Sequence, residues 1–410
     1  MTTSWIPVPA ESDFPVENLP FGIVRGVGDA APRVALRIGN HVVDLAALVE
    51  RRLVDVPPEL VAAPTLNALL ADEGGHAGRV RGQVAELLTS TPDARVEPAI
   101  HPVESVACLL PIHPGDFVDH YSSLDHATNL GRLLRPGSEP LLPNWRRLPV
   151  GYHGRSGSVI VSGTDVVRPA GLLPCDGSEP ALAPSAALDI ELEVGFVVGA
   201  PGTRIAPDDA ADHIFGAVLL NDWSARDIQA YEYQPLGPNL GKSFATTVSP
   251  WVVTLDALRP YLVPPPPQDP EPDPYLRAER PWALDLQLEI WLNGERVSAT
   301  NFRTMYWTFA QQLAHMTVNG AVARPGDLIG SGTVSGPARA ERGSLIELTW
   351  QGADPLTLAD GSHRAFLLDG DTVALHGWCG GAPPRPRIGF GAAVGTIVPA
   401  IPRARPIHDR

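Results

Sequence analysis

Cysteine is scarce in this sequence of 410 residues, which holds only three. Cys108, Cys175 and Cys379 lie far apart, and they lack both the short paired spacing of a zinc site and the even number of a disulfide framework. We therefore expect reduced structural thiols, with one reactive thiol left open as an alternative.

Positive charge and long apolar runs are also in short supply. Lys and Arg number 31 against 46 Asp and Glu, which gives a formal net charge of -15. Nucleic acids and anionic membranes require clustered Lys and Arg, so we expect neither as a partner. No stretch approaches the ~20 apolar residues that cross a bilayer, and MTTSWIPVPAESDFP lacks the basic and apolar parts of a signal peptide. These observations predict a cytoplasmic protein.

Internal repeats, a glycine-rich phosphate loop and a dinucleotide-binding fingerprint are likewise missing, whereas proline and glycine are plentiful. The chain has 44 Pro and 39 Gly, and its proline share is roughly twice the ordinary ~5%. Because proline is disfavoured inside helices and central strands, this composition favours many short strands joined by ordered turns. We predict a β-rich fold.

The hydrophobic pattern divides the chain into two parts. In the first, VALRI and HVVDL flank a Gly-Asn turn over residues 34–45, which is typical of a β-hairpin. Apolar residues then recur every three or four positions over residues 65–88, which predicts helices. Polar residues able to bind ligands become dense from His113. We therefore predict a small β domain over residues 1–112 and a larger catalytic domain over residues 113–410.

The larger part is expected to contain several strands, two helical segments and one extended loop. The strands are predicted over residues 187–198, 216–221, 250–255, 284–292, 327–331 and 344–350. The helices are predicted over residues 224–231 and 304–316. The segment VPPPPQDPEPDP over residues 263–274 predicts an extended polyproline-type surface loop, with a docking role as the alternative.

Three acids alternate with apolar residues in the segment LDIELEVGFVV. Because side chains alternate along a strand, Asp189, Glu191 and Glu193 are expected on one face, only ~7 Å apart. Such neighbours repel one another unless solvent screens them or a cation bridges them. Taken alone, the strand favours the simpler interpretation of a solvated face.

Two further acids occupy positions that suit either a structural or a chemical role. Asp222 ends an apolar run at a strand-to-helix junction, where a helix N-cap is the alternative. Asp119 lies in GDFVDHYSSLDHATN with His120, Tyr121 and His126, and a lone histidine there is ordinarily a surface residue. If the carboxylates converge, oxygen-only ligation indicates Mg²⁺ or Ca²⁺ rather than zinc.

Long segments of the chain resemble the fumarylacetoacetase family almost from end to end. They are FPVENLPFG, YSSLDHATN, LPNWRRLPVGYHGR, DIELE, HIFG, LNDWSARDIQ, YEYQPLGPNLGKSFATTVSPWVV, MYWTFAQQL, RPGDLIGSGTVSGP and FLLDGD. The resemblance implies a mainly β fold with some α, in which a small N-terminal SH3-like barrel precedes a larger mixed β-sandwich roll. It also implies a homodimer that hydrolyses a carbon-carbon bond of 4-fumarylacetoacetate, a small β-diketo acid, to fumarate and acetoacetate in tyrosine and phenylalanine (homogentisate) catabolism.

The resemblance further implies roles for individual residues. The ligands of a catalytic Mg²⁺ or Ca²⁺ would be Asp119, Glu191, Glu193 and Asp222, and a second, structural Mg²⁺ position matches Asp222, Thr246 and the backbone carbonyl of Lys242. His126 matches the general base and Glu347 the acid that orients it. Developing negative charge would be met by Arg226, Gln229 and Lys242, and substrate by Tyr121, Arg135, Tyr152, Gln229, Tyr233 and Thr333.

Simpler interpretations exist for several of these residues. Without the resemblance, Glu347 is a solvent-facing strand residue, the tyrosines pack in the core or at its rim, and Arg135 is a surface charge. The family order Asp-Phe-Tyr reads Asp-His-Tyr at residues 119–121, which could alter the pocket wall, and residues 174–187 match poorly.

Two other functions stay open at this stage. One is a related reaction on another β-diketo acid, such as acylpyruvate hydrolysis, decarboxylation or enol-keto tautomerisation. The other is a catalytically silent, metal-stabilised scaffold.

Overall fold

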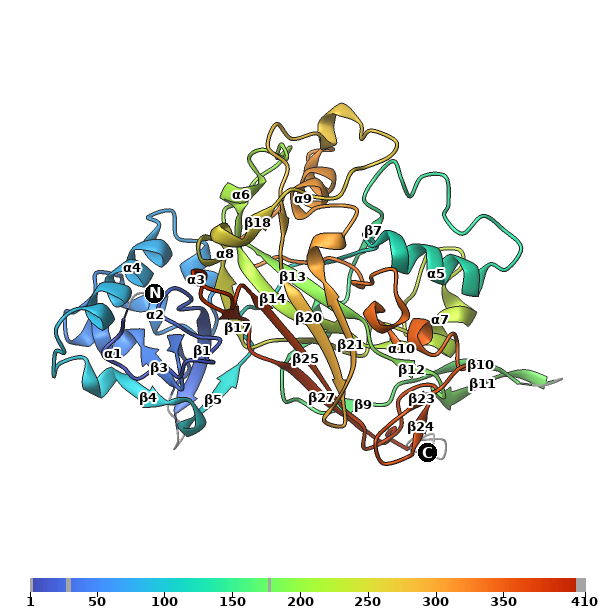
Figure 1. The fold of residues 1–410 in the computed structure, drawn as a ribbon, viewed down its shortest axis with the longest axis horizontal. Helices are drawn as coiled ribbons and strands as arrows, with labels where there is room; N and C mark the ends of the chain where they lie inside the picture. The colour runs from blue at the N-terminus through green and yellow to red at the C-terminus, as the bar shows by residue number, and fades with distance from the viewer. Residues whose placement is uncertain (1–2, 27–30, 176–177, 403–410) are drawn as a thin grey trace, which may run out of the picture.

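The computed structural model describes residues 3–26, 31–175 and 178–402. Two parts are visible, a smaller N-terminal part and a larger one built on two stacked sheets (Figure 1). Strands outweigh helices, as the proline content predicts. Within the described residues, no helix is long and apolar enough to span a membrane.

The N-terminal part packs short helices against a small sheet. Its strands are β1 (Phe21–Gly26), β2 (Arg33–Ile38), β3 (His41–Asp44), β4 (Ile100–Pro102) and β5 (Val106–Leu109). Its helices are α1 (Leu45–Glu50), α2 (Pro58–Val61), α3 (Asn67–Leu70), α4 (His76–Thr89) and the 3-10 turns η1 (Glu97–Ala99) and η2 (Val103–Ser105). Ile38 pairs with His41 across the Gly-Asn turn, which confirms the predicted hairpin.

The central sheet carries most of the strands that lead to the candidate site. They are β6 (Phe117–His120), β7 (Gly151–His153), β8 (Val159–Val161), β13 (Leu192–Val198), β14 (Ile214–Asp222), β16 (Thr246–Val248), β17 (Trp251–Thr254) and β22 (Leu328–Gly330). The order is β17-β14-β13-β22-β6-β7, and β1 pairs with β17, so the N-terminal sheet continues into this one.

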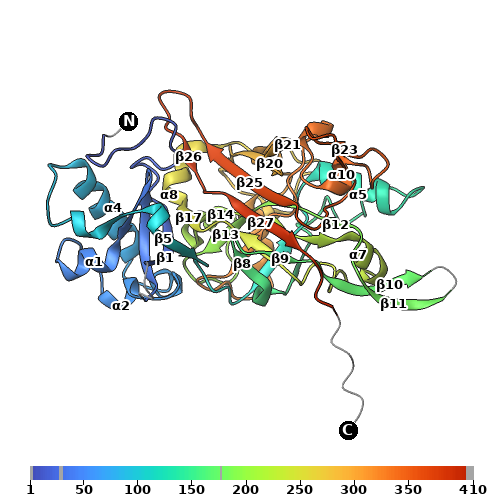
Figure 2. The ribbon, with the colours of Figure 1, turned by 90° about the horizontal axis from the view of Figure 1, so that it is seen from below.

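A second sheet lies across the central one (Figure 2). Its strands are β9 (Val166–Val167), β20 (Gln287–Leu292), β21 (Glu295–Asn301), β25 (Thr372–Cys379), β26 (Ile388–Gly389) and β27 (Ala393–Val398). Short two-stranded pairs are β10 (Ala170–Cys175) with β11 (Ser178–Pro184), β12 (Leu188–Asp189) with β15 (Ser224–Ala225), β18 (Leu262–Val263) with β19 (Ala283–Leu284), and β23 (Leu356–Thr357) with β24 (His363–Arg364).

The helices of the larger part lie around these sheets. They are α5 (Leu124–Leu134), α6 (Ala210–His213), α7 (Arg226–Glu232), α8 (Leu255–Leu258), α9 (Phe309–Thr317) and α10 (Leu345–Leu348). The 3-10 turns are η3 (Ser156–Ser158), η4 (Arg259–Tyr261), η5 (Pro274–Leu276), η6 (Phe302–Thr304) and η7 (Arg339–Glu341). Residues 264–273 form neither helix nor strand, in agreement with the predicted extended loop.

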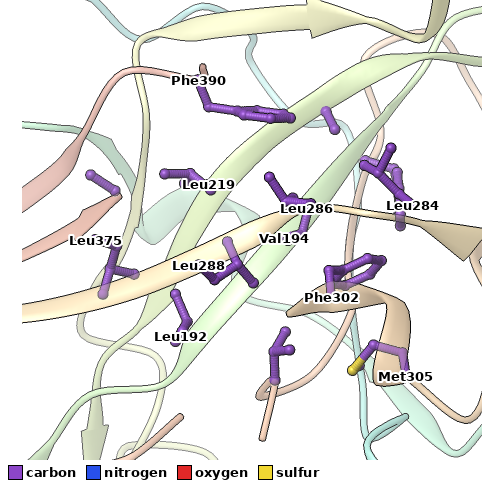
Figure 3. Packing of buried hydrophobic residues seen from close by; sticks show 14 of the residues in the cluster. Leu192, Val194, Leu219, Leu284, Leu286, Leu288, Phe302, Met305, Leu375 and Phe390 are labelled. Carbon is purple, nitrogen blue, oxygen red and sulfur yellow. The ribbon is translucent and has the colours of Figure 1, made fainter. Parts of the chain in front are cut away.

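The main core fills the space between the two sheets. Leu192 and Leu219 of the central sheet pack among Leu288 and Leu375 of the second sheet, and all four are fully buried (Figure 3). The opposite face of the central sheet, which includes Val197, packs into the N-terminal core. Because both faces are covered, a polar side chain on these strands is held inside the protein.

Three strand predictions were wrong in detail, and in the one over residues 284–292, residues 285–286 separate β19 from β20. The predicted strand over residues 344–350 contains instead the short helix α10 (Leu345–Leu348), whose first backbone N–H groups donate to the carboxylate of Asp189. That partner is remote in sequence, so the local pattern could not reveal it. The predicted strand over residues 187–198 is interrupted between β12 and β13, and its acids are buried rather than solvated.

The cysteines fit the prediction of unpaired thiols where the structure describes them. Cys108 and Cys379 are free, the first partly buried and the second fully buried. The side chain of Cys175 lies outside the described part of the chain.

Gly131 in α5 gives a stability test of the fold around His126. A methyl group there would overlap the carbonyl oxygen of Pro140, so we expect Gly131→Ala to destabilise the protein by about 1–3 kcal/mol. Gly82, in the middle of α4, has open space around it, and Gly82→Ala should instead stabilise by about 1 kcal/mol. Urea unfolding followed by circular dichroism compares the two. Equal midpoints would contradict the assigned contact between α5 and Pro140.

Candidate metal centre and active site

Three carboxylates from neighbouring strands converge inside the larger part. Asp119 lies near the end of β6, Glu193 lies in β13, and Asp222 is the last residue of β14. One oxygen from each can be chosen so that all three lie within 4.8 Å of one another, and all three residues are buried. The structure therefore excludes the solvated strand face for Glu193. It also excludes the N-cap interpretation of Asp222, because Ala225 occupies the N-cap of α7.

Two oxygens of this cluster have no hydrogen-bond partner among the described residues, namely Oδ1 of Asp119 and Oε1 of Glu193. Burial and the charges of the neighbouring acids raise the pKa of Glu193 well above its ordinary value, and burial raises the pKa of Asp222 to about 6. Buried carboxylate oxygens that lack donors suit a hard divalent cation, which prefers oxygen ligands. The cluster thus fits the predicted Mg²⁺ or Ca²⁺ in its donor chemistry.

Glu191, the fourth predicted ligand, lies beside the cluster in an ion-paired position. Its carboxylate accepts from Nζ of Lys242 and lies 2.8 Å from Nη1 of Arg226. Burial opposes the charged form of Glu191, but these two cations lower its pKa below the usual range. The structure thus groups three of the four predicted ligands, and metal ligation by Glu191 stays a prediction.

Lys242 and Thr246 both contact Asp222. Nζ of Lys242 donates to Oδ2 of Asp222 at 3.0 Å, and the hydroxyl of Thr246 donates to Oδ1 at 3.0 Å. The Lys242 ammonium and the Thr246 hydroxyl therefore both donate to this carboxylate. The second Mg²⁺ position stays a prediction.

His126 and Glu347 form a buried hydrogen-bonded pair between α5 and α10. Nδ1 of His126 lies 2.6 Å from Oε2 of Glu347. Asn129, Ser335 and Ser344 donate to the same carboxylate at 2.9, 2.9 and 2.7 Å. Burial alone would raise the pKa of Glu347, but His126 and these donors lower it to about 2. Neither residue is therefore the surface group that its local sequence indicates.

Arg226, at the start of α7, has partners at two of its three guanidinium nitrogens. Its Nε donates to Asp189 at 2.8 Å, and its Nη1 lies 2.8 Å from Glu191 and donates to Oε1 of Gln229 at 3.1 Å. Its buried Nη2 has no partner among the described residues. With Tyr233, Arg226 and Gln229 line a cavity of about 290 Å³ whose walls also include Leu134, Ile346 and Phe366.

The other predicted substrate-binding residues lie in four different settings. The rings of Tyr121 and His126 meet edge to face at 5.3 Å, and the hydroxyl of Tyr152 donates to Oδ2 of Asp119 at 2.9 Å. Arg135, at the end of α5, donates through Nη2 to the carbonyl of Pro140 at 2.8 Å. The hydroxyl of Thr333 is buried without a partner among the described residues.

Comparison with known proteins identifies the family to which this chain belongs. The family model described as fumarylacetoacetate hydrolase C-terminal matches residues 117–398, and the one described as fumarylacetoacetase N-terminal matches residues 17–111. The chain belongs to the fumarylacetoacetate hydrolase family.

Relatives of this family match along nearly the whole chain. Fumarylacetoacetase from Homo sapiens is 45% identical over 419 residues, which is 97% of this chain and 99% of the relative. Fumarylacetoacetase from Arabidopsis thaliana is 44% identical over 420 residues, with the same coverage. Among solved structures, a fumarylacetoacetate hydrolase from Exiguobacterium antarcticum gives a TM-score of 0.55 at 19% identity, over 93% of this chain and 100% of that one. This last likeness supports the shared fold alone.

Arg155 is a site residue that the sequence reasoning missed. Its Nη2 lies 2.8 Å from Oδ2 of Asp119 and 2.5 Å from Oδ2 of Asp222, and its guanidinium stacks on the rings of Phe117 and Tyr152. Its backbone has a φ of 60°, in the left-handed region. The only signal was its place at the end of LPNWRRLPVGYHGR, a segment shared with the fumarylacetoacetate hydrolase family.

His120 stands where the family pattern has phenylalanine, and it behaves as a neutral buried ring. Burial lowers its pKa to about 3, and Nδ1 lies 3.3 Å from the carbonyl oxygen of Gly330. The ring is thus uncharged at neutral pH, and the local departure from the family adds no charge beside Asp119.

The acid cluster predicts a specific loss of metal binding in Asp119→Asn. An outer-shell residue of a metal site is typically worth about 10–100-fold in metal affinity, so loss of a direct ligand should weaken Mg²⁺ or Ca²⁺ binding by at least about 100-fold. The control is Asp256→Asn, which changes an exposed, ion-paired aspartate to asparagine. Isothermal titration calorimetry measures both variants. Unchanged affinity in Asp119→Asn would remove this residue from the metal site.

The lowered pKa of Glu347 predicts an acid-sensitive contribution to stability. A carboxyl whose folded pKa is depressed stabilises the protein above its unfolded pKa of 4.5, and this stabilisation is lost as the pH falls towards the folded value of about 2. Glu347→Gln has no proton to take up. We expect the free energy of unfolding of the wild type to fall by about 2 kcal/mol more than that of the variant between pH 5 and pH 3.

Urea unfolding at a series of pH values measures this difference. Parallel pH dependence of the two proteins would contradict an ionised, hydrogen-bonded Glu347 in the folded state.

Proposed function

We propose that this protein hydrolyses the carbon-carbon bond of 4-fumarylacetoacetate, giving fumarate and acetoacetate, as the last step of tyrosine and phenylalanine breakdown. The observation that carries the proposal is a buried acid cluster and a His126–Glu347 pair in a chain that matches curated fumarylacetoacetases over 97% of its length. The His126–Glu347 pair would activate a water molecule. The acid cluster, with a bound cation, would stabilise the enolate that leaves.

His126 is the group suited to activate water. The carboxylate of Glu347 accepts a hydrogen bond from Nδ1–H of His126. In the neutral imidazole this leaves the other ring nitrogen, Nε2, as the acceptor. In the proposed reaction Nε2 removes a proton from water, and the hydroxide attacks the carbonyl beside the unsaturated acid. Glu347 then stabilises the imidazolium that forms.

Three donors are placed to meet the negative charge that develops on the attacked oxygen. Arg226, whose Nη2 has no partner among the described residues, and Gln229 line the cavity of about 290 Å³, and the ammonium of Lys242 contacts Glu191 and Asp222. One such preorganised donor contributes about 3–4 kcal/mol in other hydrolases. When the tetrahedral species collapses, the carbon-carbon bond breaks and its electron pair leaves as the enolate of acetoacetate, which then takes up a proton.

A divalent cation, Mg²⁺ or Ca²⁺, would be held by Asp119, Glu193 and Asp222, with Glu191 as the predicted fourth ligand. Bound there, it supplies Lewis acidity that polarises the β-diketone and stabilises the enolate. Support for this cofactor comes from the unpartnered oxygens of Asp119 and Glu193.

We further propose a cytoplasmic homodimer, with domains over residues 1–112 and 113–410. The family models matched at residues 17–111 and 117–398 support this division. The strand order β5-β1-β2-β3-β4 in the N-terminal part supports a small SH3-like barrel there, because η2 links β4 directly to β5. Family resemblance supports the homodimer and the compartment.

The test is a hydrolysis assay with fumarylacetoacetate as the substrate. Its loss is monitored by ultraviolet absorbance, and the products fumarate and acetoacetate are detected directly. We expect EDTA to abolish the reaction and added Mg²⁺ or Ca²⁺ to restore it. No turnover by folded, metal-replete protein would reject this substrate. Hydrolysis of acylpyruvates under the same conditions would then favour the related β-diketo acid reaction, whereas inactivity on all of these substrates would favour a silent scaffold.

The variant His126→Ala separates the base from the metal centre. We expect it to fold and bind metal normally while turnover falls by about 10²–10⁴-fold, the usual contribution of a positioned general base. Metal titration and the fumarate assay are run on the same preparation. Turnover close to that of the wild type would remove His126 from the role of base.

A further inference from the structure

Asp189 is a buried acid whose role is not explained by metal binding. It lies in β12, fully buried, outside the group of three acids that could share a cation. Its carboxylate accepts four hydrogen bonds, from Nε of Arg226 at 2.8 Å and from the backbone N–H groups of Ile190, Leu345 and Ile346 at 2.7, 2.7 and 3.1 Å. Both oxygens are thus fully used within the protein.

One side of this carboxylate fixes the direction of Arg226. Asp189 takes Nε and Glu191 takes Nη1, so the guanidinium plane is held at two of its three nitrogens. The third, Nη2, is the buried donor left without a partner among the described residues. A freely rotating arginine could offer any nitrogen to a ligand, whereas this one offers only Nη2.

The other side of the same carboxylate holds the start of α10. Leu345 and Ile346 are the first two residues of this helix, and Glu347 is the third. Glu347 contacts His126, so the position of Asp189 is transmitted to the imidazole through one helical turn. Asp189 therefore contacts both Arg226 and the first residues of α10.

We propose that Asp189 is a positioning residue that fixes, through one carboxylate, the free donor of Arg226 and the Glu347–His126 pair relative to each other. The proposal rests on the proposed function, because that function assigns the chemistry of Arg226 and His126. It goes beyond that function by giving Asp189 a role distinct from those of Glu191 and Glu193 in the same segment. A shared anchor ties the position of the base to that of the oxyanion donor.

The variant Asp189→Asn tests this role, because it preserves shape but removes the charge and one acceptor. We expect kcat for fumarylacetoacetate to fall about 10–100-fold, the size of effect typical of losing a residue that orients functional groups, with metal affinity unchanged. In an Arg226→Gln background the same substitution should lower kcat by a smaller factor, because one of its two targets is already gone.

Asp371→Asn is the matched control. Asp371 is also buried and also accepts from an arginine, Arg364, and from a backbone N–H, that of Leu368. Both substitutions should lower the unfolding midpoint, but only Asp189→Asn should lower kcat of the folded fraction. Equal kcat in the two variants would overturn the proposal.

A second readout does not depend on the substrate. The Nδ1–H proton of His126, bound to Glu347, should give a downfield proton NMR signal that is identified by its loss in Glu347→Gln. We expect Asp189→Asn to shift or broaden this signal and Asp371→Asn to leave it unchanged. An unchanged signal in Asp189→Asn would overturn the coupling even if the wild type proved inactive on fumarylacetoacetate, which would reject the proposed function alone.

Discussion

The burial of several like charges in one small volume is the constraint on which the rest of this structure depends. Five acids and three bases meet there, all of them buried side chains: Asp119, Asp189, Glu191, Glu193 and Asp222, with Arg155, Arg226 and Lys242. When all are ionised, two negative charges remain uncompensated, which is the charge that one divalent cation supplies. Removing a charge from water without such compensation is costly, so the cluster and its cation are best regarded as one unit.

The acid cluster and the His126–Glu347 pair come from different kinds of element in the fold. The acids that converge come from β6, β13 and β14, which lie in a sheet covered on both faces by hydrophobic cores. Strands fixed in this way hold repelling groups at short range, where a loop would let them spread. The His126–Glu347 pair comes instead from α5 and α10, outside the sheet, where serine and asparagine donors hold Glu347 in place.

Local sequence patterns captured the strands better than they captured the site. The Gly-Asn hairpin and the apolar runs of β14, β17 and β20 were predictable because one or both faces of each strand are buried, and the pattern reflects this directly. The helix α10 was not predictable, because its N–H groups are satisfied by Asp189, which is 156 residues away from Leu345. Local periodicity carries no information about such a partner.

For the site as well, some residues could be predicted from the sequence and others could not. Family resemblance brought together Asp119, Glu193 and Asp222, which composition and spacing could not do, since alternation predicts only that neighbouring acids share a face. Arg155 was not predicted, because a guanidinium that bridges two carboxylates produces no periodic pattern in the sequence. Burial of Glu191 was equally hidden, because the cations that neutralise it come from distant positions, Arg226 and Lys242.

The pairing of β1 with β17 ties the N-terminal part to the catalytic sheet, through Phe21 opposite Val252 and Gly22 opposite Trp251. If residues 1–112 were removed, β17 would become a sheet edge with unsatisfied backbone groups and a bare row of apolar side chains. Edges of that kind recruit strands from other molecules and promote aggregation. The N-terminal part therefore covers this edge of the sheet through β1, and a chain without it would expose the edge to other molecules.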